Sequence, residues 1–154
     1  MIKILRLSLI VFFLKLSFLK AEIVKPSIEI NPVQVVKIQL DGLMKNDSPY
    51  KDKGIEQTWE FAHPNNKKFT GPLNKFKEMI KGESYKMLID HENHEVKEIF
   101  LNNDIAVFEV VIMDADKKYF KFKWQVEKYL NNGPLENCWL TTVVSPPVPL
   151  GASI

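Results

Sequence analysis

Residues 119–127 read YFKFKWQVE and alternate between apolar and polar side chains from Phe120 onward. Successive residues of a β-strand point to opposite faces, so the apolar residues at even positions share one face and the polar residues at odd positions share the other. This pattern predicts a sheet with one buried face and one largely solvent-exposed face. Residues 105–113, IAVFEVVIM, are apolar on both faces apart from Glu109. They predict a central strand covered by helices on one side and by a partner subunit on the other.

Further strands are expected on both sides of this pair. Short polar turns separate the apolar runs, and such turns between successive strands predict an antiparallel meander. The five predicted strands are residues 85–89, 96–101, 105–113, 119–130 and 138–144.

Helical spacing dominates the chain before residue 84. Asn31 followed by Pro32 is a helix start signal, and apolar residues recur at helical spacing from there to about Met44. A second helix is expected after Asp52, which can cap it. His63 before Pro64 predicts the break that ends that helix.

A third helix is expected between Thr70-Gly71-Pro72, which would open it, and Gly82, which would end it. Helices followed by antiparallel strands predict an α+β domain. In such a domain the N-terminal helices bury their apolar stripes by packing on one face of a curved antiparallel sheet.

Residues 1–21 have the features of a signal peptide, with Lys3 and Arg6 before an apolar stretch and Ala21 at a plausible cleavage point. Lys15 interrupts the apolar stretch, and the alternative is an uncleaved membrane anchor. We therefore divide the chain into a signal peptide (1–21), one α+β domain (22–144) and an extended, proline-rich tail (145–154). We expect the protein to be exported across a membrane, into the periplasm, into the thylakoid lumen or out of the cell.

The leader also changes the charge of the chain. It holds four of the 21 basic residues and no acidic ones, which leaves 17 basic against 19 acidic side chains in the remainder, a net charge near −2. The basic surface expected of a nucleic-acid-binding protein is therefore absent, and nucleic acid is excluded as a partner. A membrane contact is expected only through the leader, if it stays attached. Cys138 is the only cysteine, so no internal disulfide can form.

Residues 54–88, GIEQTWEFAHPNNKKFTGPLNKFKEMIKGESYKML, carry a family resemblance through Phe61-Ala62, Pro64, Gly71-Pro72, Phe76 and Tyr85. The segment resembles an uncharacterised family of bacteria and photosynthetic organisms that is related to the nuclear-transport-factor-2-like superfamily. The resemblance implies a cone-shaped α+β fold in which a bent sheet wraps around helices and leaves a pocket. Members of that superfamily include isomerases, dehydratases and proteins that bind small ligands or other proteins.

Aromatic residues are the candidates for lining such a pocket, with simple core packing as the alternative. The candidates are Trp59, Phe76, Tyr85, Trp124 and Trp139. Weaker catalytic candidates are Glu109, His63, which titrates near neutral pH, and the hydroxyl of Tyr85. Glu109 would act in the pocket if its strand face is the concave one, and would be a surface residue otherwise.

Two clusters of potential metal ligands have the wrong spacing for known motifs. Residues 90–95, DHENHE, and 114–116, DAD, are both interpreted as polar turns between strands. We therefore expect neither a metal nor another cofactor.

The sequence favours an exported, non-enzymatic domain that binds a small apolar ligand or a protein partner. One alternative is an acid/base enzyme of isomerase or dehydratase type that uses Glu109 or His63 beside the Tyr85 hydroxyl. Another alternative is a structural homodimer formed through the outer face of the sheet.

Overall fold

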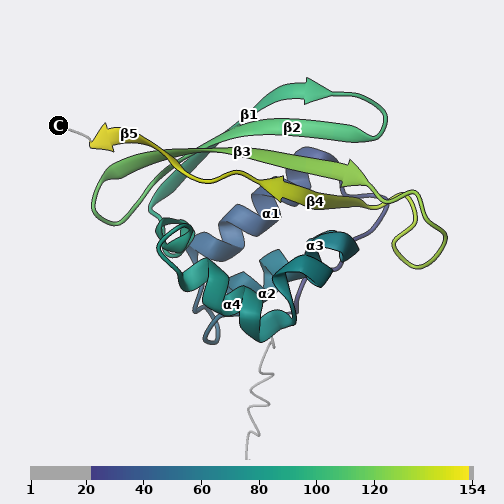
Figure 1. Ribbon diagram of the computed structural model, residues 1–154, viewed down its shortest axis with the longest axis horizontal. Helices are drawn as coiled ribbons and strands as arrows, with labels where there is room; N and C mark the ends of the chain where they lie inside the picture. The colour runs from purple at the N-terminus through teal and green to yellow at the C-terminus, as the bar shows by residue number, and fades with distance from the viewer. Residues whose placement is uncertain (1–21, 153–154) are drawn as a thin grey trace, which may run out of the picture.

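The computed structural model describes residues 22–152, so the predicted signal peptide lies outside the described residues. Within residues 22–152 the chain forms an α+β arrangement of four α-helices and an antiparallel five-stranded sheet that does not close. The helices lie together on one face of the sheet (Figure 1). The general prediction of N-terminal helices on an antiparallel sheet is therefore confirmed.

The helices precede the strands along the chain. The helices are α1 (Pro32–Met44), α2 (Lys53–Glu60), α3 (Pro64–Thr70), α4 (Leu73–Lys81) and a 3-10 turn, η1 (Lys86–Leu88). The strands are β1 (Asn93–Leu101), β2 (Ile105–Met113), β3 (Lys118–Lys128), β4 (Trp139–Val144) and β5 (Val148–Ala152). The sheet order is β1-β2-β3-β4, and β5 also pairs with β3.

The alternation predicted for β3 is confirmed. Phe122, Trp124 and Val126 are buried against the helices, whereas Lys123 on the opposite face is exposed. In the neighbouring strand β2, the residues paired with this buried row, from Ala106 to Ile112 at even positions, are also fully buried. The inner face of the two central strands therefore forms the floor of the hydrophobic core.

Helix α1 begins and ends where the sequence predicts. The Asn31 side chain accepts a hydrogen bond from the Gln34 amide at 2.9 Å, and the Gln34 side chain accepts one from the Asn31 amide at 2.9 Å. This reciprocal pair satisfies two amide groups that a helix start leaves without partners. The buried side of α1 contains Val36, Leu40 and Leu43, which pack on the sheet.

Asp52 precedes α2 as predicted, but its side chain does not cap that helix. The backbone of Asp52 is left-handed, with φ at 64°, and its carboxylate points toward α4. Asn46 replaces it at the helix start, because its side-chain oxygen accepts a hydrogen bond from the Ile55 amide at 3.1 Å. The Asp52 carboxylate can therefore pair with lysine side chains of α4.

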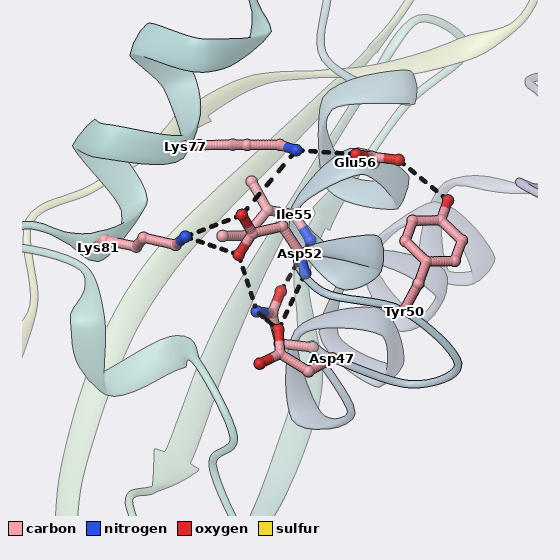
Figure 2. A network of polar contacts seen from close by, with 8 residues as sticks. Asp47, Tyr50, Asp52, Ile55, Glu56, Lys77 and Lys81 are labelled. Carbon is pink, nitrogen blue, oxygen red and sulfur yellow. Dashed lines mark hydrogen bonds and ion pairs between the residues drawn. The ribbon is translucent and has the colours of Figure 1, made fainter.

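Ion pairs fasten α4 to α2 (Figure 2). The Lys81 ammonium lies 2.7 Å from the Asp52 carboxylate, and the Lys77 ammonium lies 2.8 Å from the Glu56 carboxylate. The hydrogen bond from Lys81 lowers the pKa of Asp52, and the one from Lys77 lowers the pKa of Glu56. Both carboxylates therefore stay charged well into the acidic range, and α4 keeps its apolar side turned inward.

Three segments differ from the sequence-based expectation. Residues 85–89 are not a strand: hydrogen bonds from Lys86 to Gly82 and from Leu88 to Tyr85 close local turns instead. The break at His63-Pro64 does occur, but a short extra helix, α3, follows it because His63 caps it and Pro64 suits its first position.

The third difference concerns the proline-rich tail. Residues 148–152 form β5, which pairs with residues 118–121 of β3. Strands β4 and β5 thus pair with different parts of the same strand. Figure 1 shows β5 running along the edge of the sheet toward the C-terminus. Part of the tail is therefore an edge strand of the domain. Among the described residues, no helix has the length and apolar character needed to cross a membrane.

Candidate ligand-binding cavity

A cavity of about 260 Å³ lies between the helices and the inner face of the sheet. It receives side chains from all four helices and from β3 and β4. Its apolar lining consists of Leu43, Ala62, Phe76, Met79, Ile80, Leu88, Trp124, Val143 and Val144. Its polar lining consists of Gln39, Thr58, Asn66, Thr70, Tyr85, Thr141 and Thr142.

Three side chains at the cavity wall form a closed set of hydrogen bonds. The Thr141 hydroxyl donates to the Gln39 side-chain oxygen at 2.6 Å, and the Trp124 indole donates to the same oxygen at 3.1 Å. The Gln39 amide nitrogen donates to the Thr58 carbonyl at 3.0 Å. The bonds join α1, α2, β3 and β4 at one point, and they hold the Trp124 ring against the cavity.

The α3 side of the cavity is held to β4. The Asn66 side-chain nitrogen donates to the carbonyl oxygens of Thr141 and Thr142, at 3.0 and 2.7 Å. Just before α3, the His63 amide donates to the Thr141 carbonyl at 2.9 Å, and the Thr141 amide donates to the Phe61 carbonyl at 2.8 Å. These bonds place Asn66 and Thr70 in the cavity wall.

The cavity wall carries no charge at neutral pH. Of the described residues that line it, only Tyr85 is titratable, and burial raises the pKa of its hydroxyl further. The Tyr85 hydroxyl donates to the Val144 carbonyl at 3.2 Å. A charged ligand group would be desolvated here without an opposite charge, which is costly, whereas a neutral polar group could accept or donate a hydrogen bond.

The structure brings three of the five predicted aromatic residues to the cavity: Phe76, Tyr85 and Trp124. The other two lie outside its lining. Trp59 packs against Phe76, with ring centroids 5.0 Å apart, and has the Lys67 ammonium 5.4 Å from its centroid. Trp139 has the Lys128 ammonium 5.2 Å from its ring.

Of the three weaker catalytic candidates, Tyr85 lines the cavity, whereas Glu109 and His63 do not. Glu109 lies on the outer face of β2, opposite Lys97 and Lys123 in the neighbouring strands, with its carboxylate 3.6 Å from the Lys121 ammonium. Its side chain is 40% exposed. Of the two positions considered for Glu109, in the pocket or on the surface, it therefore occupies the surface one. His63 is the N-cap of α3, where its Nδ1 accepts a hydrogen bond from the Asn65 amide at 3.1 Å.

The polar part of the cavity wall was not predicted from the sequence. The available signal was the position of Gln39 on the apolar stripe of α1, and in the structure its side chain is indeed buried. A buried amide needs partners, so its position predicts a polar contact inside the domain. Asn66 gave no such signal, because its role depends on an α3 that was not predicted.

The cluster at 90–95 also differs from an exposed turn. His91 is 1% exposed, and its Nε2 lies 2.8 Å from Nδ1 of His94. The left-handed backbone of Asp90, with φ at 53°, accompanies this turn. Among the described residues no group of three or more potential ligands could hold a metal ion. The 114–116 segment is the predicted turn, with the Asp114 side chain accepting from the Asp116 and Lys118 amides at 2.9 Å.

The fold and the cavity together define an α+β domain with an uncharged cavity between its helices and its sheet. The chain matches no protein-family model, no curated protein and no solved structure.

Proposed function

We propose that this domain binds a small, neutral and mostly apolar ligand in the cavity between its helices and its sheet. The observation that carries the proposal is the uncharged lining of a cavity of about 260 Å³. Ligand sites are typically concave and mostly apolar, with a few polar groups that fix orientation. In this cavity the hydroxyls of Thr58, Thr70 and Tyr85 are such polar groups.

We further propose that the domain is a cone of the nuclear-transport-factor-2-like type, with this cavity as its pocket. The helices on one face of an open antiparallel sheet support that proposal. An exported location is proposed from the features of residues 1–21. Glu109 and His63 have no role in this binding, because neither is among the described residues that line the cavity.

The test uses N-phenyl-1-naphthylamine, a neutral aromatic amine whose fluorescence rises when it leaves water. We expect saturable fluorescence enhancement with the wild-type chain. Met79, which lies half-buried in the cavity wall, is replaced by tryptophan to fill the space (M79W). The substitution M79W should weaken probe binding by about tenfold or more, equivalent to at least about 1.4 kcal/mol.

The matched control places the same substitution on the outer face of the sheet, at the half-buried Met113 (M113W). It should leave probe affinity unchanged, and circular dichroism should confirm that both variants fold. An absence of probe binding by the wild type, or equal weakening in M79W and M113W, would contradict the proposal.

A further inference from the structure

Helix α3 presents an aromatic ring to water. Phe69 is 91% exposed, and no residue of α3, all of which the structure describes, is fully buried. Isolated exposed apolar residues are common, so Phe69 alone would indicate nothing. Its surroundings are what distinguish it.

Positive charge accompanies the exposed ring. Residues 61–77 contain four lysines and no acidic residue. Lys77 pairs with Glu56, and Lys67 lies over the Trp59 ring. Within residues 22–152, Lys68 and Lys75 are exposed and have no ion-pair partner.

These two lysines lie near the C-terminal end of α3, the end that carries Phe69. Lys68 is the neighbour of Phe69 in sequence. The Lys75 side chain lies over Gly71, where a Cβ atom would be 2.8 Å from the Lys75 Cδ, so it reaches the C-terminal end of α3. The next acidic residue along α4 is Glu78, one helical turn after Lys75.

The same short helix forms part of the cavity wall. Asn66 and Thr70 line the cavity, while Phe69 and Lys68 face solvent. A molecule that crosses this wall would therefore pass between the interior and the surface that carries Phe69. The neighbouring helix α4 is fastened to α2 by ion pairs, whereas α3 is held by hydrogen bonds from Asn66 to β4, by the 61–63 segment and by the Lys67 ammonium, which donates to the Glu60 carbonyl.

We infer that α3 docks this domain onto an anionic lipid surface, with Phe69 inserted at the headgroup boundary and Lys68 and Lys75 against the headgroups. Apolar side chains that insert at the headgroup boundary and lysines that contact anionic headgroups are the two contributions by which proteins attach to such an interface. If the cavity binds an apolar ligand, as proposed above, the ligand would be taken from or delivered to the bilayer. The docking itself does not depend on that proposal.

A lipid surface fits these observations better than an acidic protein does. A stable protein interface buries about 800 Å² on each partner and needs an extended complementary surface. Here one projecting ring and two flexible lysines suffice for a fluid surface that closes around the ring. Only a weak and reversible attachment is expected from so small a contact.

The test is flotation of the full-length chain with two kinds of vesicle. One is phosphatidylcholine alone, and the other contains in addition about 30% phosphatidylserine, whose headgroups supply negative charge. We expect binding to the anionic vesicles that weakens at high salt. The substitution F69A should reduce partitioning by about tenfold. The double substitution K68A/K75A should reduce it by about fivefold for each lysine.

Matched controls make the same types of substitution at exposed residues outside α3. Leu130 is 62% exposed in the loop after β3, so L130A removes an exposed apolar side chain elsewhere. Lys45 and Lys51 are exposed in the region between α1 and α2, so K45A/K51A makes the same change in net charge. Both controls should bind within about twofold of the wild type. Every variant carries the same residues 1–21, so differences between variants report on α3.

A second readout follows the ring position directly. A nitrobenzoxadiazole label on F69C, in a C138A background, should shift to shorter wavelength with anionic vesicles and not with neutral ones. The same label on L130C should not shift. Cys138 is 2% exposed, so its removal leaves the surface unchanged.

The inference is overturned if the wild type does not float with anionic vesicles and the F69C label does not shift. It is also overturned if F69A and K68A/K75A bind as the controls do. Its failure is separable from failure of the proposed function, because the naphthylamine assay contains no vesicles. Conversely, M79W should bind the naphthylamine probe about tenfold more weakly and still float with anionic vesicles.

Discussion

The side chains of His91 and His94 meet in the turn that follows Asp90, a residue with a left-handed backbone. The Leu88 carbonyl, 2.7 Å from His91 Nδ1, can only accept, so that nitrogen carries a proton. In the neutral ring His91 Nε2 is then an acceptor, and His94 Nδ1 must donate to it. His94 Nε2 is left facing the Asp41 carboxylate at 3.5 Å.

The three histidines of the chain have a common effect on stability. Burial lowers the pKa of His63, His91 and His94, in each case as the main cause. The unfolded chain, with histidine pKa values of about 6.5, therefore binds protons more readily than the folded domain. The contribution of these histidines to stability is fully present above about pH 7.5 and is lost as the pH falls through about 6.5 and below.

We therefore predict that the free energy of unfolding decreases between about pH 7.5 and 5.5. Urea denaturation at a series of pH values measures it. H94N keeps an N–H near the Nδ1 position but does not titrate, so its decrease should be smaller. A free energy that is constant or rises on acidification would contradict the assignment.

At the scale of elements, the contact between α1 and α2 requires a glycine. A Cβ atom on Gly54 would lie 2.1 Å from the Gly42 carbonyl oxygen and 2.9 Å from the Asn46 Cα, both backbone atoms. The two helices can approach this closely only because Gly54 has no side chain. The approach places Thr58 of α2 beside Gln39 of α1, and so builds the polar wall of the cavity.

Gly54→Ala should consequently destabilise the domain by about 3 kcal/mol, because the backbone of α1 must move. The control is Gly42→Ala in the same contact, where the nearest atom would be at an ordinary 3.4 Å. Alanine has the higher helix propensity, so this change should be neutral or stabilising by up to about 1 kcal/mol. Thermal or urea denaturation of both variants decides the matter, and equal effects would disprove the close-packing argument.

At the scale of the whole molecule, the sheet is completed by residues distant in sequence. Both β4 and β5 pair with β3, β4 with residues 124–128 and β5 with residues 118–121. One strand therefore carries two partners along the same edge, end to end (Figure 1). The homodimer proposed through the outer face of this sheet stays a prediction.

Truncation after Pro147 tests the contribution of β5. Loss of its backbone hydrogen bonds should lower the free energy of unfolding by about 2 kcal/mol. Hydrogen exchange should accelerate at residues 118–121, which lose their partner, and stay slow at residues 124–128, which keep β4. Unchanged exchange at residues 118–121 would show that β5 does not pair in solution.

Local patterns determined much of this architecture. The capping pair at Asn31, the alternation of 119–127 and the apolar 105–113 run all depend on neighbours a few residues away, so α1, β2 and β3 could be predicted. The same holds for the aromatic residues Phe76 and Trp124 in the cavity, because large apolar side chains must be buried somewhere in a domain of this size.

The tertiary structure decided what depends on distant partners. Gln39 and Thr141 are 102 residues apart in sequence, and their bond exists only once α1 has packed on β4. The same is true of Asn66 beside the Thr142 carbonyl, of Glu109 on the outer face and of β5 beside β3. Side-chain periodicity fixes which residues share a face, whereas long-range packing fixes which face is covered and by what.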